Sequence, residues 1–187
     1  VEGKAQEEDF DRTLATTIET LEYAQNNADV PFGVFKPTGL GSINIYEKVS
    51  LGNPLTQEEQ NSWDNTLVRW RQIIEKANEL GVPVMVDAEE SWIQPAVDDL
   101  AIQYMRTYNQ GKAIVYNTAQ LYRHDRLAQL TDALELAKNE GFIYAVKIVR
   151  GAYMEKERER ASRLGYASHD RQYERRAPCR SWHPPAP

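Results

Sequence analysis

Three charged residues stand at or near the end of apolar runs, where a folded chain can place chemically active groups. Lys36 ends the run VPFGVFK, Asp87 follows VPVMV, and Arg150 lies near the end of YAVKIVRG. A further run, KAIVYNT, ends in amide and hydroxyl side chains, with Gln120 just beyond it. A solvated loop would explain any one of these polar residues. All four together are better explained by a polar site that brings a lysine, an aspartate, an amide and an arginine to one face.

Lys147 differs from these residues because it lies inside an apolar run. Side chains alternate along a strand, so Lys147 and Val149 would share one face, and Val146 and Ile148 the other. If helices cover the face of Val146 and Ile148, Lys147 points into the crevice of a sheet or barrel. A buried ammonium must meet a carboxylate or an anionic ligand. Alternatively, Lys147 reaches the rim and pairs with a structural carboxylate; its position alone leaves both interpretations open.

The elements that would position these residues alternate along the chain. Apolar runs typical of buried strands lie at 30–36, 82–90, 112–118 and 144–151, and segments typical of helices lie at 9–27, 56–80, 94–109, 125–139 and 154–164. Thr56 and Glu59 have the spacing of a capping box, Gly81 and Gly141 follow two helices, and Asp9 or Asp11 would cap the first. This alternation predicts an α/β fold with parallel strands covered on both faces. Ligands of such folds bind at the carboxyl ends of the strands.

Other patterns favour structural roles. The TGLGS connection (38–42) lacks the spacing of a phosphate-binding loop and is expected to be flexible. Trp63 and Trp70 indicate a packed helix face, and EKERER (155–160) predicts a solvated helix with charge pairs and no further role. His124 stands alone and is expected to be structural. No residues have metal-ligand spacing, so no metal is expected.

The composition limits the class of protein and its partners. The 187 residues carry a net charge of −6 and are 41% hydrophobic, which indicates a globular chain and argues against nucleic acid or an anionic membrane surface as the main partner. No apolar stretch approaches the roughly 18 residues of a membrane helix. The single Cys179 excludes an internal disulfide. We therefore expect a soluble, intracellular protein whose proline- and arginine-rich end, 165–187, forms a disordered tail.

Four segments resemble those of one enzyme family. VPVMVDAEES, NTAQLYR and VKIVRGAYMEKER are similar to segments of the proline dehydrogenase (proline oxidase) family, and FKPTGLG resembles the strand of that family that ends in an active-site lysine. The resemblance runs in order from about Val1 to Leu164. It implies a modified (βα)8 barrel that binds FAD at the carboxyl ends of its strands. It also implies oxidation of L-proline to Δ1-pyrroline-5-carboxylate, with hydride transfer from proline C5 to flavin N5 and electrons passed to a membrane quinone.

The resemblance assigns a role to each candidate residue. Lys36 would lie beside the proline carboxylate, Tyr153 would cover the substrate, and Asp87 would be a catalytic carboxylate near the flavin. Lys147 would be the second catalytic residue, a cation that stabilises the anionic reduced flavin, and Gln120 would hydrogen-bond the flavin ring. The residues implied to bind the cofactor are Val86, Gln120, Lys147, Val149, Arg150, Gly151 and Ala152.

The resemblance also sets expectations for the extent and setting of the chain. Val1–Lys4 resembles the end of the family's first strand, so residues 1–164 would form about the first five βα units of an incomplete (βα)8 barrel, and 165–187 is interpreted as an aberrant tail. Such a chain could be an inactive truncated fragment, or a different barrel enzyme that forms a Schiff base through Lys36 or Lys147. A bacterial cytoplasm with peripheral contact to the inner membrane and a mitochondrial matrix both fit.

Overall fold

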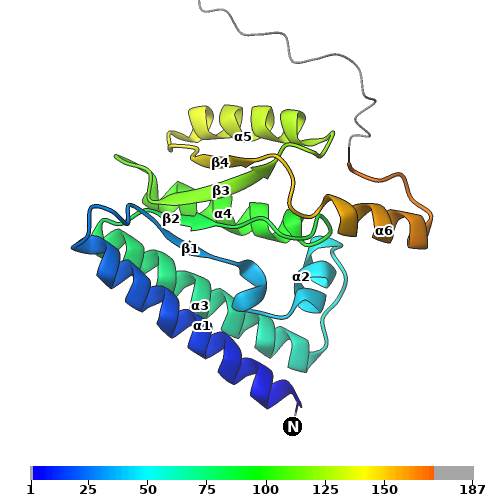
Figure 1. Ribbon diagram of the computed structural model, residues 1–187, viewed down its shortest axis with the longest axis horizontal. Coiled ribbons are helices and arrows are strands. Elements are labelled where there is room, and N and C mark those ends of the chain that lie inside the picture. The colour runs from blue at the N-terminus through cyan, green and yellow to red at the C-terminus, as the bar shows by residue number, and fades with distance from the viewer. Residues whose placement is uncertain (1, 171–187) are drawn as a thin grey trace, which may run out of the picture.

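Four short strands pair in the order in which they occur in the chain (Figure 1). They are β1 (Gly33–Phe35), β2 (Val84–Val86), β3 (Val115–Gln120) and β4 (Val146–Val149), and every neighbouring pair is parallel. This is a computed structural model, and it describes residues 2–170. Consecutive parallel strands joined through helices form the wall of a (βα)8 barrel, so the α/β class and the partial barrel expected from the sequence are confirmed.

The helices and one 3-10 turn lie between and after the strands. They are α1 (Glu2–Gln25), η1 (Pro37–Gly39), α2 (Ile43–Ser50), α3 (Gln57–Leu80), α4 (Gln94–Tyr108), α5 (Arg126–Glu140) and α6 (Met154–Leu164). The expected capping box is present, because Thr56 accepts from the backbone N–H of Glu59 while the Glu59 side chain accepts from that of Thr56. Gly81 and Gly141 end α3 and α5 with φ of +69° and +79°, a conformation that favours glycine.

The start of the chain contradicts two sequence expectations. The segment expected to end a barrel strand, Val1–Lys4, is helical from Glu2 onward, and the residues that follow it, AQEE at 5–8, favour a helix. Asp9, expected as a possible helix cap, lies within α1 and pairs with Arg12 at 2.9 Å. The described residues therefore contain four barrel strands.

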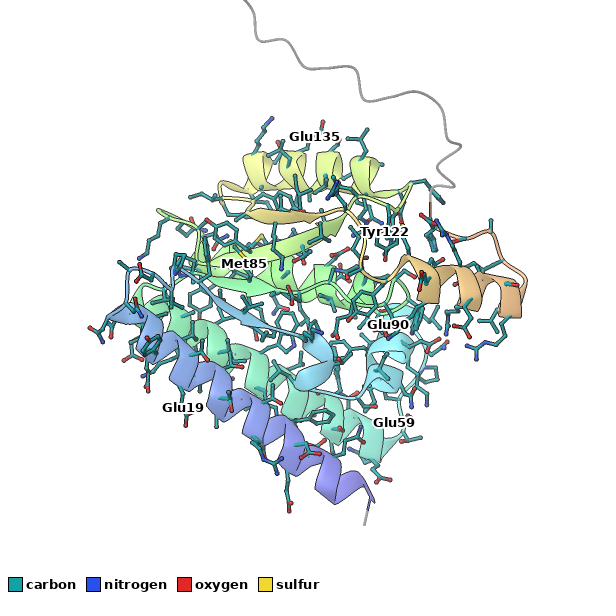
Figure 2. All side chains as sticks on the ribbon, in the orientation of Figure 1. Glu19, Glu59, Met85, Glu90, Tyr122 and Glu135 are labelled. Carbon is teal, nitrogen blue, oxygen red and sulfur yellow. The ribbon has the colours of Figure 1, made fainter. Side chains whose placement is uncertain are left out.

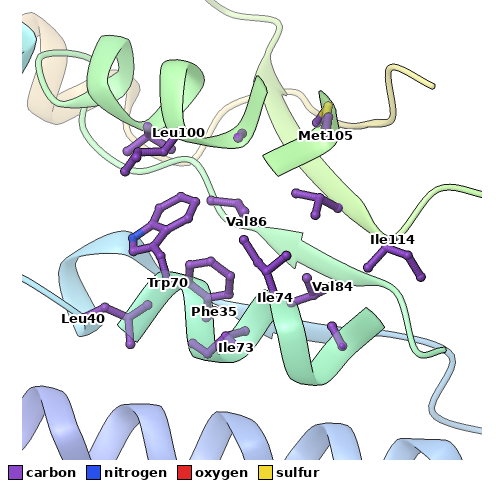
Figure 3. Packing of buried hydrophobic residues seen from close by; sticks show 14 of the residues in the cluster. Phe35, Leu40, Trp70, Ile73, Ile74, Val84, Val86, Leu100, Met105 and Ile114 are labelled. Carbon is purple, nitrogen blue, oxygen red and sulfur yellow. The ribbon is translucent and has the colours of Figure 1, made fainter. Parts of the chain in front are cut away.

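The hydrophobic core lies between the sheet and the helices. Phe35, Val84 and Val86 point toward the helices and are buried with Trp70 of α3 (Figure 3). The rings of Phe35 and Trp70 pack edge to face with their centroids 4.9 Å apart. The Trp70 indole donates a hydrogen bond to the buried Tyr46 hydroxyl at 2.6 Å, so these two buried polar groups are partners of each other. The packed helix face predicted around Trp70 is confirmed.

The opposite face of the sheet is open. Val34, Met85 and Tyr116 alternate with the core residues and are partly or fully exposed, so the expectation that helices cover both faces is wrong for these strands. On the helix side, Ile148 of β4 is 61% exposed. The reason is that α6 does not cover β4; it lies beyond the carboxyl ends of the strands, near α2 (Figure 1).

Two connections are packed more tightly than their sequences indicate. In the TGLGS segment, Leu40 and Gly41 are buried, and a Cβ at Gly41 would collide with the Thr66 side chain. The expectation that this connection is flexible is therefore wrong. The packed part of the chain also extends past Leu164 to Asp170, because His124 donates its backbone N–H to the carbonyl of His169 at 2.9 Å and Asp170 is buried. The rest of the expected tail, 171–187, lies outside the described residues. Within residues 2–170, no helix is both long and apolar enough to cross a membrane.

Candidate active site

One row of polar residues crosses all four strands near their carboxyl ends. The register pairs Phe35 with Val86, Met85 with Tyr116, and Thr118 with Lys147. Continued to the next residues, this register places four side chains in line on the open face of the sheet. They are Lys36, Asp87, Thr118 and Lys147. The row includes two of the three predicted strand-end charges, Lys36 and Asp87, but not Arg150, which is exposed on the turn after β4; the member from β4 is Lys147.

Within this row, Lys147 forms an ion pair with Asp87. The Lys147 ammonium donates to Asp87 Oδ1, and the two side chains are 27% and 28% exposed. Between them, the Thr118 hydroxyl donates to the Val86 carbonyl at 2.6 Å. The pair answers the question raised by a lysine inside an apolar run, because the partly buried ammonium meets a carboxylate. That carboxylate, itself a candidate site residue, follows β2, which is separated from β4 by β3.

A second row lies just beyond the first. Glu89 accepts from the backbone N–H of Thr38 at 2.9 Å and from its hydroxyl at 2.8 Å. The backbone carbonyl of Glu89 accepts from Gln120 Nε2 at 2.6 Å, and Gln120 pairs in register with Val149. Gln120 is 1% exposed. Its Oε1 atom has no hydrogen-bond partner among the described residues, and this is costly in a buried amide unless a ligand supplies a donor.

Burial affects the acid–base properties of two groups beside these rows. It raises the pKa of the Glu89 carboxyl, although the hydrogen bonds from Thr38 offset part of the effect. Burial also raises the pKa of the Tyr153 phenol, and the nearby Glu89 carboxylate adds to the shift. Perturbed groups gathered at one end of a sheet are typical of functional sites.

Helix α6 closes the side of the site that follows β4. Glu157 is 1% exposed and accepts from the Ser91 hydroxyl and from the backbone N–H of His169, the latter at 2.9 Å. Lys156 donates to Glu90 at 2.7 Å, and Figure 2 shows Glu90 beside the start of α6. The expectation that the EKERER segment is only a solvated helix is therefore wrong, because a strictly solvated helix would not bury a carboxylate.

Comparison with known proteins decides the family. The family model described as proline dehydrogenase matches residues 1–172. The chain belongs to the proline dehydrogenase family. One relative is the carbapenem antibiotics biosynthesis protein CarD of Pectobacterium carotovorum, which is 37% identical to this chain over 158 residues. The matched residues are 84% of this chain and 42% of CarD. Human mitochondrial proline dehydrogenase 1 is 40% identical over 111 residues, 59% of this chain and 18% of the human protein. The chain thus spans less than half the length of these relatives.

The fold agrees with the family. Proline utilization A (PutA) from Bdellovibrio bacteriovorus, crystallised after inactivation by N-propargylglycine, superposes with a TM-score of 0.73 at 19% identity. The superposition covers 90% of this chain and 18% of PutA. PutA from Corynebacterium freiburgense gives a TM-score of 0.66 at 16% identity over 89% of this chain and 16% of that protein. The four strands and their helices therefore adopt the fold of proline dehydrogenase barrels.

The remaining residues predicted from the family resemblance lie around the two rows. The Val86 side chain points into the helix-covered core, so only the backbone of Val86 reaches the site. Arg150, Gly151 and Ala152 are exposed on the turn after β4, and the partly buried Tyr153 precedes α6. A Cβ at Gly151 would lie 3.2 Å from Met154 Sδ and 3.4 Å from the Tyr122 ring, so the turn is also close-packed at this glycine.

Sequence reasoning missed two members of these rows, Thr38 and Glu89, and gave Thr118 only as the polar end of an apolar run. Thr38, Glu89 and Thr118 make hydrogen bonds that link neighbouring strand ends. Each lies two residues from a predicted site residue: Thr38 from Lys36, Glu89 from Asp87, and Thr118 from Gln120. Side-chain alternation along strands was the available signal. Extended past the ends of β1 and β2, it would have found both Thr38 and Glu89.

A separate cavity of about 290 Å³ lies on the helix side of β3, between α4 and α5. Asp98 is its central charge and accepts from Gln94 at 2.8 Å, Asn117 at 2.7 Å and Arg126 at 3.0 Å. These contacts pair the partly buried aspartate with a buried arginine. The cavity lies on the other side of the sheet from the rows, so it is not the candidate active site.

Proposed function

We propose that this chain supplies the substrate- and cofactor-binding strand ends of an FAD-dependent proline dehydrogenase that oxidises L-proline to Δ1-pyrroline-5-carboxylate. The observation that carries the proposal is the row of Lys36, Asp87, Thr118 and Lys147, because family members are expected to hold cofactor and substrate at this end of the barrel. Bound FAD would supply the acceptor, N5, for a hydride from proline C5.

The described residues fit a flavin. The buried Gln120 Oε1 lacks a partner, and an isoalloxazine ring offers an N–H group that such an amide oxygen can accept from. Lys147, held by Asp87, places a positive charge on the open face of the same strand ends. The cofactor-binding set would be Gln120, Lys147 and Val149, together with the backbone of Val86 and of the turn Arg150, Gly151 and Ala152.

The side chains of the first row would bind and orient proline. Lys36 is exposed at the end of β1, where its ammonium would pair with the proline carboxylate. The Lys147 ammonium would stabilise negative charge that develops beside it, and Asp87 would keep that ammonium in place. Tyr153 would cover the substrate from the start of α6. Fixed charges that need no rearrangement are the main contribution that a protein makes to hydride transfer.

The alternative of a Schiff-base lysine enzyme is less well supported. A Schiff base requires the lysine nitrogen to attack a carbonyl carbon, whereas the Lys147 nitrogen is engaged in an ion pair with Asp87. Incubation with a carbonyl substrate and borohydride would leave a covalent adduct on Lys36 or Lys147 if this alternative held. We expect no adduct.

The electron acceptor and the compartment are also proposals. Electrons would pass from the reduced cofactor to a quinone, by peripheral contact with a membrane. Relatives from Drosophila melanogaster and Homo sapiens are named as mitochondrial proline dehydrogenases, which supports a mitochondrial setting for this chain. A bacterial cytoplasm beside the inner membrane is the second candidate compartment.

Binding of FAD to the purified chain tests the proposal. We expect Gln120→Leu to weaken FAD binding about tenfold or more, because a buried hydrogen bond to the ring would be lost. Gln129→Leu is the matched control, since Gln129 is exposed on α5. Both affinities would be measured by quenching of flavin fluorescence, with thermal unfolding to check folding. Absence of FAD binding by the unaltered chain would contradict the proposal.

A further inference from the structure

Glu89 is a buried carboxylate that forms no ion pair among the described residues, although the nearby charge of Lys36 offsets part of the rise in its pKa caused by burial. It is 4% exposed, and within residues 2–170 none of the ion pairs includes it. Its neighbour Glu90 is also buried but pairs with Lys156. Burying a carboxylate without a cation is costly, so hydrogen bonds must hold Glu89 in place.

Both carboxylate oxygens of Glu89 bind the same residue of another segment. Oε2 accepts from the backbone N–H of Thr38 and Oε1 from the Thr38 hydroxyl. Thr38 lies two residues after Lys36, in the η1 turn that Pro37 begins. On the other side of Lys36, the Phe35 carbonyl accepts from the backbone N–H of Asp87 at 3.0 Å. The backbone that carries Lys36 is thus tied to the β2–α4 connection on both sides.

The main chain of Glu89 makes a different contact. Its carbonyl accepts from Gln120 Nε2, so the backbone at position 89 orients the amide that would face the flavin. A substitution at position 89 keeps this carbonyl but changes the carboxylate. The side chain of Glu89 therefore acts on the Lys36 side of the site, and its backbone acts on the Gln120 side.

We propose that Glu89 is a positioning residue that fixes the turn after Lys36 and thereby sets where that lysine meets the substrate carboxylate. The role of Lys36 rests on the proposed function, whereas the clamp on Thr38 is a property of the chain itself. Glu89 touches neither substrate nor cofactor in this proposal. Its loss should weaken proline binding and leave FAD binding nearly unchanged, which distinguishes it from a residue that only supports the fold.

The clamp can be tested in the chain without ligand. Glu89→Gln should raise the hydrogen-exchange rate of the Thr38 amide about tenfold or more, because a charge-assisted hydrogen bond is weakened. Amides of α1 and α3 should keep their rates. Glu140→Gln is the matched control, since Glu140 also accepts two hydrogen bonds, from Arg106, but lies at the far end of α5. An unchanged rate at Thr38 in Glu89→Gln would overturn the proposal.

Kinetics test the consequence for the substrate. In the chain loaded with FAD, Glu89→Gln should raise KM for L-proline about tenfold while FAD affinity and kcat change less than about twofold. Thr38→Val should also raise KM for L-proline, but by a smaller factor. In the double variant, KM should rise by less than the product of the two single-variant factors, because both substitutions break the same contact. Equal losses of FAD and proline binding, or an unchanged KM, would overturn the proposal.

The two tests separate this proposal from the proposed function. If the unaltered chain binds no FAD, the proposed function fails, and the assigned role of Lys36 fails with it. If FAD binds and proline reduces it but Thr38 exchange is insensitive to position 89, only the Glu89 proposal fails.

Discussion

On the helix-covered face, β1 and β2 pack into a closed apolar core, whereas the opposite face is open and ends in two rows of polar side chains. The same strands supply both, because Phe35 and Val86 point one way and Lys36 and Asp87 the other. The inward side chains of β1 and β2 pack with Trp70 and are buried. The polar rows leave a charged pair half-buried and one buried amide oxygen without a partner. Side chains that stabilise the core and side chains of the candidate site therefore occupy adjacent positions along the chain.

The largest expected effect is on the covered face. Trp70→Ala should lower the free energy of unfolding by about 3–5 kcal/mol, because it opens a cavity in the core and leaves the Tyr46 hydroxyl without its donor. Denaturant unfolding of the chain measures this change. Trp70→Phe, which keeps most of the ring but loses the indole N–H, should cost less. Equal stability of Trp70→Ala and the unaltered chain would contradict a core centred on Trp70.

A smaller effect is expected where α6 meets the site. Burial by itself would raise the pKa of Glu157, but hydrogen bonds from Ser91 and from the His169 backbone lower it below the usual value. A carboxyl whose folded-state pKa is lowered stabilises the fold above its unfolded-state pKa, and this stabilisation is lost as the pH falls through the folded-state pKa. Glu157→Gln should therefore be less stable at neutral pH, and the difference should vanish in acid.

Thermal unfolding across this pH range measures the difference. Glu155→Gln is the control, because Glu155 is exposed on the same helix. A Glu157→Gln difference that is the same at neutral and acid pH would contradict the buried hydrogen bonds of α6.

The smallest effect on stability is expected at β4, whose helix-side residue Ile148 is not covered by a helix. Ile148→Thr should change the free energy of unfolding by no more than about 0.5 kcal/mol, because Ile148 is 61% exposed. The same substitution at Ile74, which is fully buried, should cost about 2–4 kcal/mol. Chemical denaturation of the two variants gives both values. Similar costs at the two positions would show that β4 is covered.

The sequence predicted the elements well because periodicity and end signals are local. The capping box at Thr56, the glycines at 81 and 141, and the four apolar runs all coincide with helix ends or strands. Lys36 and Asp87 also fall on one row as predicted, since parallel strands bring their carboxyl ends together, whereas Arg150 lies outside it on the exposed turn after β4. What failed depended on distant contacts. Glu157 is buried only because Ser91, far away in the sequence, faces it.

Other site contacts could not be read from the sequence for the same reason. The pairing of Lys147 with Asp87 spans 60 residues, and the clamp from Glu89 to Thr38 spans 51. Neither partner is marked by a local pattern. The helix at Glu2 was mistaken for a strand end through family resemblance, although its residues favour a helix. Local composition was the better guide at that position.

Reduction of FAD by proline tests the central claim most directly. The purified chain, mixed with FAD and then with L-proline without oxygen, should retain a flavin absorbance band that proline bleaches. Lys147→Met should bind FAD but bleach more slowly, by about 10²–10³-fold, because the cation that stabilises developing negative charge is lost. Bleaching of the Lys147→Met variant at the unaltered rate would contradict the account, as would a chain that retains no flavin.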